Sequence, residues 1–246
     1  MDISFMVGIL VFIFGLLIGS FLNVVIFRVP KGESIAFPAS HCQSCNTPLK
    51  WYHNIPVFSW LFLGGKCAFC KEPISKQYPI IELLNATIYL LLFYKLGVVW
   101  YLPFVLATFS ALLALVMIDF EYMAVPDSIN FFALATSLIQ PNYIDAIINA
   151  SIAAGGLWFI GFISSVIAKK QAMGGADVIV AGTMGALLGF PNFFIAIFLS
   201  AILAIIPSLI NRENGVPFVP FLAMATLIVY LYDTEVLQLV ESLIYG

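Results

Sequence analysis

The sequence predicts an all-α polytopic membrane protein with about eight transmembrane helices and one small polar loop domain. Of the 246 residues, 62% are hydrophobic and only 9% are charged, whereas soluble domains carry about 25% charged residues. Apolar runs recur along the chain, several of them near the roughly 20 residues that a membrane-crossing helix needs. Polar residues gather in one segment, residues 28–78. The net charge of −3 argues against a nucleic-acid partner.

The first apolar run is too long for the core of a signal peptide and lacks a small-residue cleavage site, so we expect it to be retained as a span. The fourth and sixth runs are short, and each ends at a proline, Pro141 or Pro191. Either the neighbouring acids lie below the headgroups, or these boundaries are misplaced by a few residues. The expected spans are residues 5–27, 80–94, 102–118, 128–140, 146–168, 178–190, 192–209 and 217–232.

Basic residues predict the orientation of these spans. If the N-terminus is outside, only Lys95 of the ten basic residues falls outside, which is a strong positive-inside signal. Asp119 and Asp177 then lie at the cytoplasmic ends of their spans. The basic residues placed inside are Arg28, Lys31, Lys50, Lys66, Lys71, Lys76, Lys169, Lys170 and Arg212.

All four cysteines lie in the polar segment as two Cys-x-x-Cys-x-x-Pro repeats, with 21 residues between the pairs. Two such turns can supply the four thiolates of a tetrahedral structural zinc site, and the metal would supply folding energy to a loop this small. A reducing cytoplasm disfavours disulfides, although two redox pairs or ordinary buried thiols are the alternatives. His41 and His53 are not needed as ligands. The predicted ligands are Cys42, Cys45, Cys67 and Cys70.

Two carboxylates stand at the ends of apolar runs. Asp119 ends the third run, and Asp177 precedes the sixth, after Gly174 and Gly175. Charged groups at membrane depth are costly, so they are usually functional and paired. The pair predicts an intramembrane aspartic protease, in which one carboxylate activates water and the other donates a proton. The alternative for each acid is a solvated interfacial carboxylate.

The sequence also predicts roles for Asp177 itself and for residues near the two carboxylates. We expect Asp177, at a helix N-terminus, to be the ionised member of the pair. Asp127 competes with Asp119, and we interpret it as a helix N-cap. Glu82 is expected to meet Arg28 or another base, with a role in the site as the lesser alternative. We expect Gly174 and Gly175 to form the active-site hinge, and residues 181–186, a run of small side chains, to pack closely against another helix.

Six motifs resemble those of the type IV prepilin peptidases, in the same order and over nearly the whole chain. Three departures accompany the resemblance: Ala176 and Val219 replace glycines, and Ile179 stands where many members carry lysine. The Ala176 change leaves the backbone conformation there open. The motifs are residues 19–30 (GSFLNVVIFRVP), 54–61 (NIPVFSWL), 78–84 (YPIIELL), Ile118-Asp119 with 125–127 (VPD), Met173 to Asp177 (MGGAD) and 217–222 (PFVPFL).

The resemblance implies a bacterial inner-membrane endopeptidase that cleaves prepilins or pseudopilins after a glycine on the cytoplasmic side. Such prepilins and pseudopilins belong to type IV pili and type II secretion. It also implies N-methylation of the new terminus with S-adenosylmethionine, although no residues for that cofactor are identified. The cysteine loop resembles that of methylating members. The implied domains are a first helix (1–27), a cytoplasmic zinc domain (28–78) and a helical protease domain (79–246).

Two other classes of protein fit part of the pattern. An ion-coupled transporter also has short spans, intramembrane acids and glycine breaks, but it needs acids along a path across the bilayer. Here the acids of the spans, Asp145 and the terminal ones excepted, lie at the cytoplasmic ends. A zinc-bearing scaffold without chemistry would have no reason to keep two acids on one face.

Overall fold

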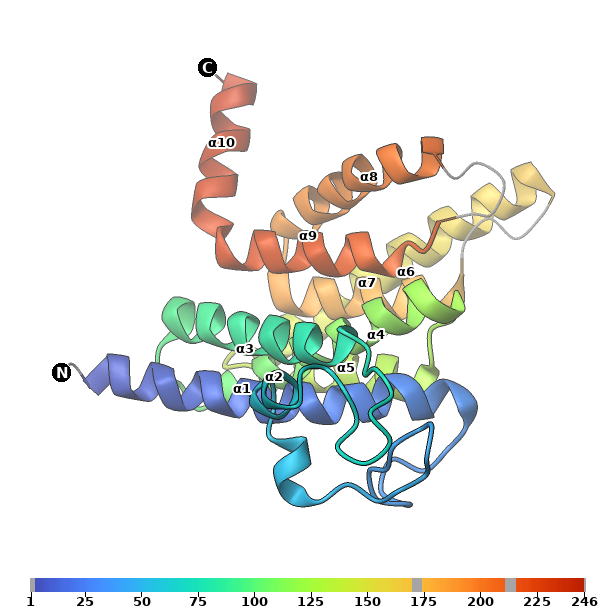
Figure 1. Ribbon diagram of the computed structural model, residues 1–246. Helices are drawn as coiled ribbons and strands as arrows, with labels where there is room; N and C mark the ends of the chain where they lie inside the picture. The colour runs from blue at the N-terminus through green and yellow to red at the C-terminus, as the bar shows by residue number, and fades with distance from the viewer. Residues whose placement is uncertain (1–2, 170–173, 211–215, 246) are drawn as a thin grey trace. The chain divides into compact units, whose positions relative to one another are not determined.

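The computed structural model describes residues 3–169, 174–210 and 216–245. Lys170, Met173 and Arg212, which entered the sequence predictions, lie outside these residues. The described residues are mostly helical, and their β-structure is limited to two isolated bridges. The chain divides into two compact units, residues 1–99 and 100–246, and each is described by itself (Figure 1).

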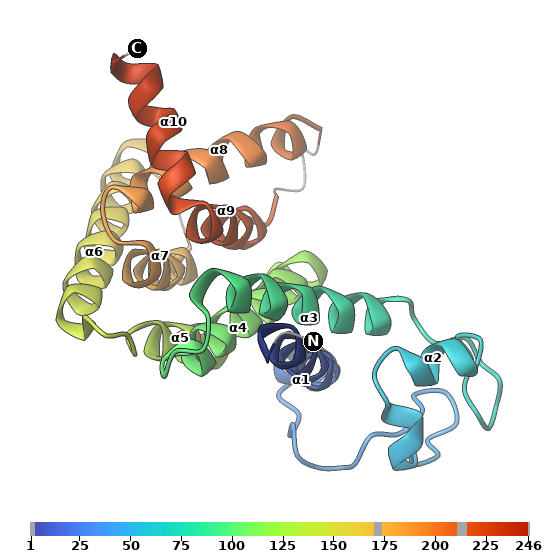
Figure 2. The same cartoon turned by 90° about the vertical axis from the view of Figure 1, so that its left-hand side faces the viewer.

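The first unit pairs two long helices and places the polar segment between them in sequence. Helix α1 (Ile3–Arg28) packs along α3 (Gln77–Leu96), and the two run side by side in both views (Figures 1 and 2). Between them the chain forms two 3-10 turns, η1 (Val29–Lys31) and η2 (Trp51–Asn54), and the short helix α2 (Phe58–Phe62).

Glycines allow the close approach of α1 and α3. A Cβ atom on Gly15 would lie 2.6 Å from the Cα of Ala86, and one on Gly19 would lie 2.7 Å from the Cα of Glu82. Small residues at such crossings bring helix backbones together in membranes. Asn85 reinforces the contact by donating from Nδ2 to the carbonyl of Gly15 at 2.8 Å.

The second unit is a bundle with α7 inside it. The helix α7 packs against α5, α6 and α9, while α4 packs against α5 and α9 (Figure 2). In its most apolar window α4 is 72% buried, whereas α6 and α8 are only 17% buried. The peripheral helices therefore leave their apolar sides for lipid. The bounds are α4 Leu102–Tyr122, α5 Asp127–Ser137, α6 Tyr143–Ala168, α7 Gly175–Leu188, α8 Asn192–Ile210, α9 Val219–Leu231 and α10 Asp233–Tyr245.

The small-residue run on α7 forms the expected close contact. A Cβ atom on Gly185 would lie 2.5 Å from the Cβ of Ala153 and 2.6 Å from the carbonyl oxygen of Asn149, both on α6. The prediction for residues 181–186 is confirmed, because only a glycine lets α6 approach this turn of α7.

Each predicted span contains a helix, although α5, α7 and α9 stop one to three residues short of the predicted bounds, which confirms the all-α membrane fold. Within the part of the chain that the structure describes, five helices are long and apolar enough to cross a membrane: α1, α3, α4, α6 and α8. The helices α7 and α9 are apolar but shorter, and α5 has only 11 residues. The count of eight spans therefore stays a prediction. The helix α10 was not predicted, because its acidic and polar residues do not form an apolar run. The division into a first helix, a zinc domain and a protease domain also stays a prediction. In the structure α3, which that division assigns to the protease domain, packs on α1.

Candidate active site and metal centre

Asp119 lies on the last turn of α4 and is 6% exposed. The helix ends just beyond it, where Met123 adopts the left-handed conformation and its N–H closes the turn on the Asp119 carbonyl at 3.0 Å. The Asp119 carboxylate accepts a hydrogen bond of 3.2 Å from the backbone N–H of Val219. Because Val219 is the first residue of α9, the carboxylate of one helix satisfies a free amide at the N-terminus of another.

Asp177 lies in the first turn of α7 and is half-buried. Gly174 is the N-cap of this helix, and its backbone N–H donates a hydrogen bond to the Asp177 carboxylate. That contact is one half of a capping box, in which the third helical side chain reaches back to the cap. The sequence prediction placed Asp177 just before the apolar run and at a helix N-terminus; the helix begins at Gly175, so Asp177 lies in its first turn.

Both carboxylates therefore sit at helix N-termini, Asp119 at that of α9 and Asp177 at that of α7. A carboxylate in such a position is stabilised by roughly 0.3–2 kcal/mol. The two groups are also close enough to interact electrostatically, and both belong to the second unit. Which member of the pair is ionised stays a prediction, and a helix N-terminus no longer separates the two acids, because the α9 amide supplies Asp119 with the same environment.

Asp127 lies apart from this arrangement. It is exposed and is the first residue of α5, with Pro126 as the N-cap and no side-chain cap hydrogen bond. The expectation that Asp127 caps the helix is therefore wrong; its charge instead lies in the first turn, where the helix dipole favours an anion.

Asn130 was missed by the sequence analysis. Its side chain is fully buried, and its Nδ2 donates to the carbonyl of Ala176 at 3.0 Å. The bond ties α5 to the first turn of α7, one residue before Asp177. Among the described residues, its Oδ1 has no hydrogen-bond partner. An asparagine in an apolar helix was the available signal, since buried polar side chains almost always have partners.

The departures from the family motifs are accommodated by the backbone. Ala176 is a helical residue and does not occupy the left-handed region, so the loss of a glycine costs nothing there. Gly174 has φ −71°, and a Cβ atom on it would lie 3.4 Å from Oδ2 of Asp177. That separation is an ordinary van der Waals contact, and any residue except proline offers the same N–H, so neither space nor conformation requires a glycine at this position. Val219 contributes only its backbone N–H, which glycine and valine share.

In the first unit, the two cysteine repeats form matching turns. An isolated bridge closes each one, His41 with Pro48 and Lys66 with Pro73. In each turn the first cysteine donates its N–H five residues ahead, to Thr47 at 3.0 Å or Glu72 at 2.8 Å. The residue after each second cysteine has a positive φ, 54° for Asn46 and 63° for Lys71.

The two turns bring all four sulfur atoms within 4.8 Å of one another. The Sγ atoms of Cys42 and Cys70 are 3.8 Å apart, which matches the edge of about 3.8 Å that tetrahedral Zn–S bonds of about 2.3 Å produce. The four cysteines therefore form a cluster that can hold a metal ion. No cysteine is in a disulfide.

The electrostatics of the turns also suit a thiolate site. Backbone N–H groups of Cys70 and Phe69 lower the pKa of Cys67 to about 6. The hydroxyl and the N–H of Thr47 lower the pKa of Cys45. The Glu72 N–H lowers the pKa of Cys70, but burial and the neighbouring thiols outweigh it and raise that pKa to about 12. Ligation by a metal requires thiolates, so the low-pKa members are ready to bind first.

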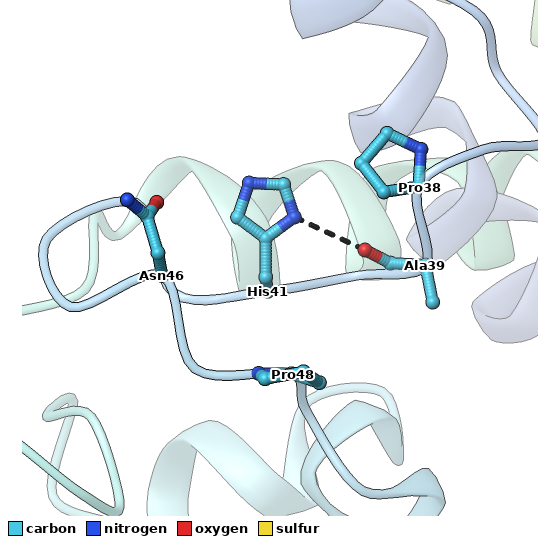
Figure 3. Close-up of a pocket in the computed structure, with 5 residues that line it drawn as sticks. All are labelled: Pro38, Ala39, His41, Asn46 and Pro48. Carbon is cyan, nitrogen blue, oxygen red and sulfur yellow. Dashed lines mark hydrogen bonds between the residues drawn. The ribbon is translucent and has the colours of Figure 1, made fainter.

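A shallow hollow of about 280 Å³ lies beside the first cysteine turn and is lined by Pro38, Ala39, His41, Asn46 and Pro48. Figure 3 shows the His41 ring turned toward the Ala39 carbonyl, with Nδ1 at 3.0 Å from that oxygen. The lining carries no carboxylate that could face the cationic amine and sulfonium of S-adenosylmethionine. This hollow therefore does not identify a methyl-donor site.

Glu82 has a different partner from the one expected. Arg28 instead donates to the carbonyl of Ser34 at 3.0 Å. The Glu82 carboxylate accepts 2.7 Å from the backbone N–H of Val57 and a further hydrogen bond from Ser20. The expectation of an ion pair with Arg28 is wrong, because backbone and hydroxyl donors already hold the carboxylate.

The fold and the two sites define a class: a multi-pass membrane protein with a four-thiol cluster in one unit and paired carboxylates at helix ends in the other. Two family models match the chain, the bacterial peptidase A24 N-terminal domain over residues 13–96 and the type IV leader peptidase family over residues 106–209. The boundary between the two units, at residues 99 and 100, falls in the gap between the two matched ranges.

Curated relatives agree with this match. The prepilin leader peptidase/N-methyltransferase of Dichelobacter nodosus is 31% identical, with 92% of each chain covered. The protein of that name from Pseudomonas aeruginosa is 30% identical over 90% of this chain and 89% of its own. A third, from Myxococcus xanthus, is 34% identical over 74% of this chain but only 56% of its own length.

The chain therefore belongs to the type IV leader peptidase family. No solved structure matches it. Membership in this family does not support the alternative that the chain is an ion-coupled transporter. The apolar helices and these bacterial relatives indicate a bacterial inner-membrane protein.

Proposed function

We propose that this protein is a membrane-embedded aspartic endopeptidase that removes the leader peptide of type IV prepilins or pseudopilins and then N-methylates the new terminus. The proposal rests on family membership and on one observation above all. Two carboxylates from helices far apart in sequence, Asp119 and Asp177, lie within electrostatic range and at the N-termini of two packed helices.

Such a pair can hydrolyse a peptide bond without a metal ion. Two carboxylates near each other share a proton, because ionising both is costly. The ionised one removes a proton from a water molecule as the oxygen attacks the scissile carbonyl. The protonated one donates to the carbonyl oxygen. The carboxyl that took the proton from water then gives it to the departing amine as the C–N bond breaks, and the other carboxylate recovers its proton from the tetrahedral intermediate. We treat the two as a unit, since each has a helix N-terminus to stabilise its charge.

The amides around the pair position it. The N–H of Val219 directs the Asp119 carboxylate, and the N–H of Gly174 directs that of Asp177. Asn130 holds the first turn of α7 through Ala176. With both carboxylates held at backbone amides, little reorganisation is needed when charge shifts between them during the reaction.

The four-cysteine cluster is proposed to hold one structural zinc ion. The matching turns, the sulfur separations and the low pKa of Cys67 fit a four-thiolate shell. S-adenosylmethionine would supply the methyl group for the second reaction. We assign no residue to its binding.

The proposed orientation places the cysteine loop and both carboxylates on the cytoplasmic side. It is supported by the basic residues, of which only Lys95 would fall outside. A leader with basic residues would then meet the carboxylates from the side on which prepilins are made.

The decisive experiment is a reconstitution. The purified enzyme is mixed with a prepilin, with and without S-adenosylmethionine, and the products are read by mass spectrometry. We expect loss of the leader in both cases and one added methyl group only with the methyl donor. An intact prepilin in the presence of folded enzyme would contradict the proposal.

A further inference from the structure

We infer that residues 51–65 are an interfacial membrane insert, lying in the lipid headgroup layer beside α1 and α3 and anchored there by Glu82. The segment contains no Asp, Glu, Lys or Arg, and Lys50 and Lys66 bracket it. That pattern is typical of a segment that buries apolar side chains at a membrane surface while flanking lysines reach the phosphates.

The anchor sets the depth of the segment. The Val57 amide binds Oε2 of Glu82 at 2.7 Å, and Glu82 also binds Ser20. At a rise of 1.5 Å per residue, Glu82 lies about 8 Å beyond Gln77, where α3 begins, and Ser20 lies about 12 Å before Arg28, where α1 ends. Val57 is therefore held alongside the membrane helices, below the level at which they enter the polar segment.

The outer surface of the segment is apolar at that level. Four aliphatic and aromatic side chains are 40–89% exposed, and Trp51 is 79% exposed. The first turns of α3 also expose apolar side chains, at Ile80, Leu83 and Leu84. The four side chains are Ile55, Phe58, Leu61 and Phe62.

The inner side of the segment is bound to protein. Trp60 donates its Nε1–H to the carbonyl of Ile74 at 3.2 Å. Gly65, with φ +69°, lies so close that a Cβ atom there would be 2.8 Å from the Trp60 ring. The short helix α2 therefore has one side on the cysteine loop and one side free for lipid.

Many backbone amides of the segment are paired with acceptors inside the protein, so few of them need a water partner at the membrane surface. Pro56 has no N–H to satisfy. Val57, in a γ-turn at φ 61° and ψ −53°, donates to Glu82. Further along, the amides of six residues donate to carbonyls inside the segment; these are Phe58, Ser59, Leu61, Leu63, Gly64 and Gly65.

The test measures lipid contact directly in the full-length protein. All four native tryptophans (Trp51, Trp60, Trp100 and Trp158) are changed to Phe, and Phe62→Trp is introduced as the sole reporter. The protein is placed in phosphatidylethanolamine/phosphatidylglycerol vesicles in which some lipids carry bromine near the headgroup or deep in the acyl chain. The matched control is Phe37→Trp in the same background, since Phe37 is 79% exposed in the same polar loop but outside the segment.

We expect headgroup-proximal bromine to cause the largest loss of Phe62→Trp emission, and aqueous acrylamide to cause little. The control should show the reverse. If acrylamide quenches both reporters equally, the segment lies in water and the inference is wrong. If neither agent quenches Phe62→Trp, protein covers the segment, whether substrate, a second copy or another part of this chain, and the lipid assignment is also wrong.

A second variant tests the anchor. Glu82→Leu, in the Phe62→Trp background, removes the acceptor of the Val57 amide and should increase acrylamide quenching while lowering bromine quenching. Ile80→Leu, an exposed change on the same helix, should leave both unchanged. Unaltered quenching in Glu82→Leu would remove Glu82 from the proposal. If that variant does not fold, the first measurement still decides the membrane contact.

Discussion

The cysteine loop and the carboxylate pair assemble their chemistry in opposite ways. In the loop, two local turns of the same sequence pattern each supply two thiols, and matching hydrogen bonds shape both turns. In the bundle, Asp119 and Asp177 stand 58 positions apart in the numbering, and α9 supplies the amide that holds one of them. The loop is organised by short-range geometry, whereas the pair exists only if α4, α7 and α9 pack correctly.

Because of this difference, substitutions in the two sites should have different effects. A structural metal supplies folding energy locally, so damage to the thiols should first disturb residues 28–78. Helix packing in lipid holds the bundle together and does not depend on the metal. Changes to the carboxylates should abolish chemistry without loosening either unit.

The largest effect is expected from the carboxylates. Asp119→Asn and Asp177→Asn should each lower leader cleavage by about 10²–10⁴-fold or more, because each removes an acid–base group. The variants should remain folded in the membrane and keep their zinc. The measurement is the rate of prepilin cleavage by purified protein.

The matched control for that comparison is Asp127→Asn. Asp127 is exposed on α5 and makes no cap hydrogen bond, so most activity should remain. An inactive Asp127→Asn together with an active Asp119→Asn would reverse the assignment of the pair.

The next largest effect tests whether methyl transfer depends on the first unit while leader cleavage depends on the second. Cys42→Ser with Cys45→Ser should abolish zinc binding and methyl transfer, while cleavage falls only several-fold through poorer docking of the leader. A product mass spectrum shows the result directly, and elemental analysis should give about one zinc per wild-type chain. Cleaved and fully methylated product from the double variant would move methyl transfer out of the loop.

The sequence was sufficient for the features that depend on local spacing. Paired Cys-x-x-Cys turns predicted the thiol cluster, and long apolar runs predicted the helices, because each pattern is complete within a few turns of chain. The close approach at Gly185 followed from its small neighbours. The helix α10 escaped notice because it is amphipathic instead of uniformly apolar.

Partners that are backbone groups could not be predicted. The Val219 amide that binds Asp119 and the Val57 amide that binds Glu82 have no side-chain signature, since every residue except proline offers the same donor. Glu82 was therefore expected to meet a basic side chain, Arg28 or another, and the helix N-terminus that α9 presents to Asp119 was not foreseen.

A smaller effect should come from the side chain that supports α7. Asn130→Ala removes the hydrogen bond to the Ala176 carbonyl, a loss of about 1 kcal/mol that corresponds to a roughly fivefold to tenfold slower cleavage if it misplaces Asp177. Asn130→Asp should not restore the rate, because an ionised carboxylate has no hydrogen to donate to the Ala176 carbonyl and would be buried. Asn130→Gln keeps the amide donor and should recover part of the rate. The readout is kcat against KM, and we expect the loss in kcat. An unchanged kcat would limit Asn130 to a structural role.

The smallest effect concerns ionisation of the cysteine loop without metal. The amides of Cys70 and Phe69 lower the pKa of Cys67 from 9.0 to about 6. A depressed pKa of an acidic group contributes stability that is present above its unfolded value and is lost as the pH falls through the folded value. Zinc-free protein should therefore gain stability as the pH rises from about 6 toward 9, and its thiolate absorbance should show a first step near pH 6.

The variant Cys67→Ser should remove that first step, while Cys70→Ser should leave it in place, because the pKa of Cys70 is raised to about 12. A first step near pH 9 in the wild-type protein would show that the backbone amides do not reach the Cys67 sulfur when the metal is absent. The loop would then owe its geometry to the zinc ion instead of to its own turns, and the contrast with the bundle, which holds its carboxylates by protein contacts alone, would be sharper.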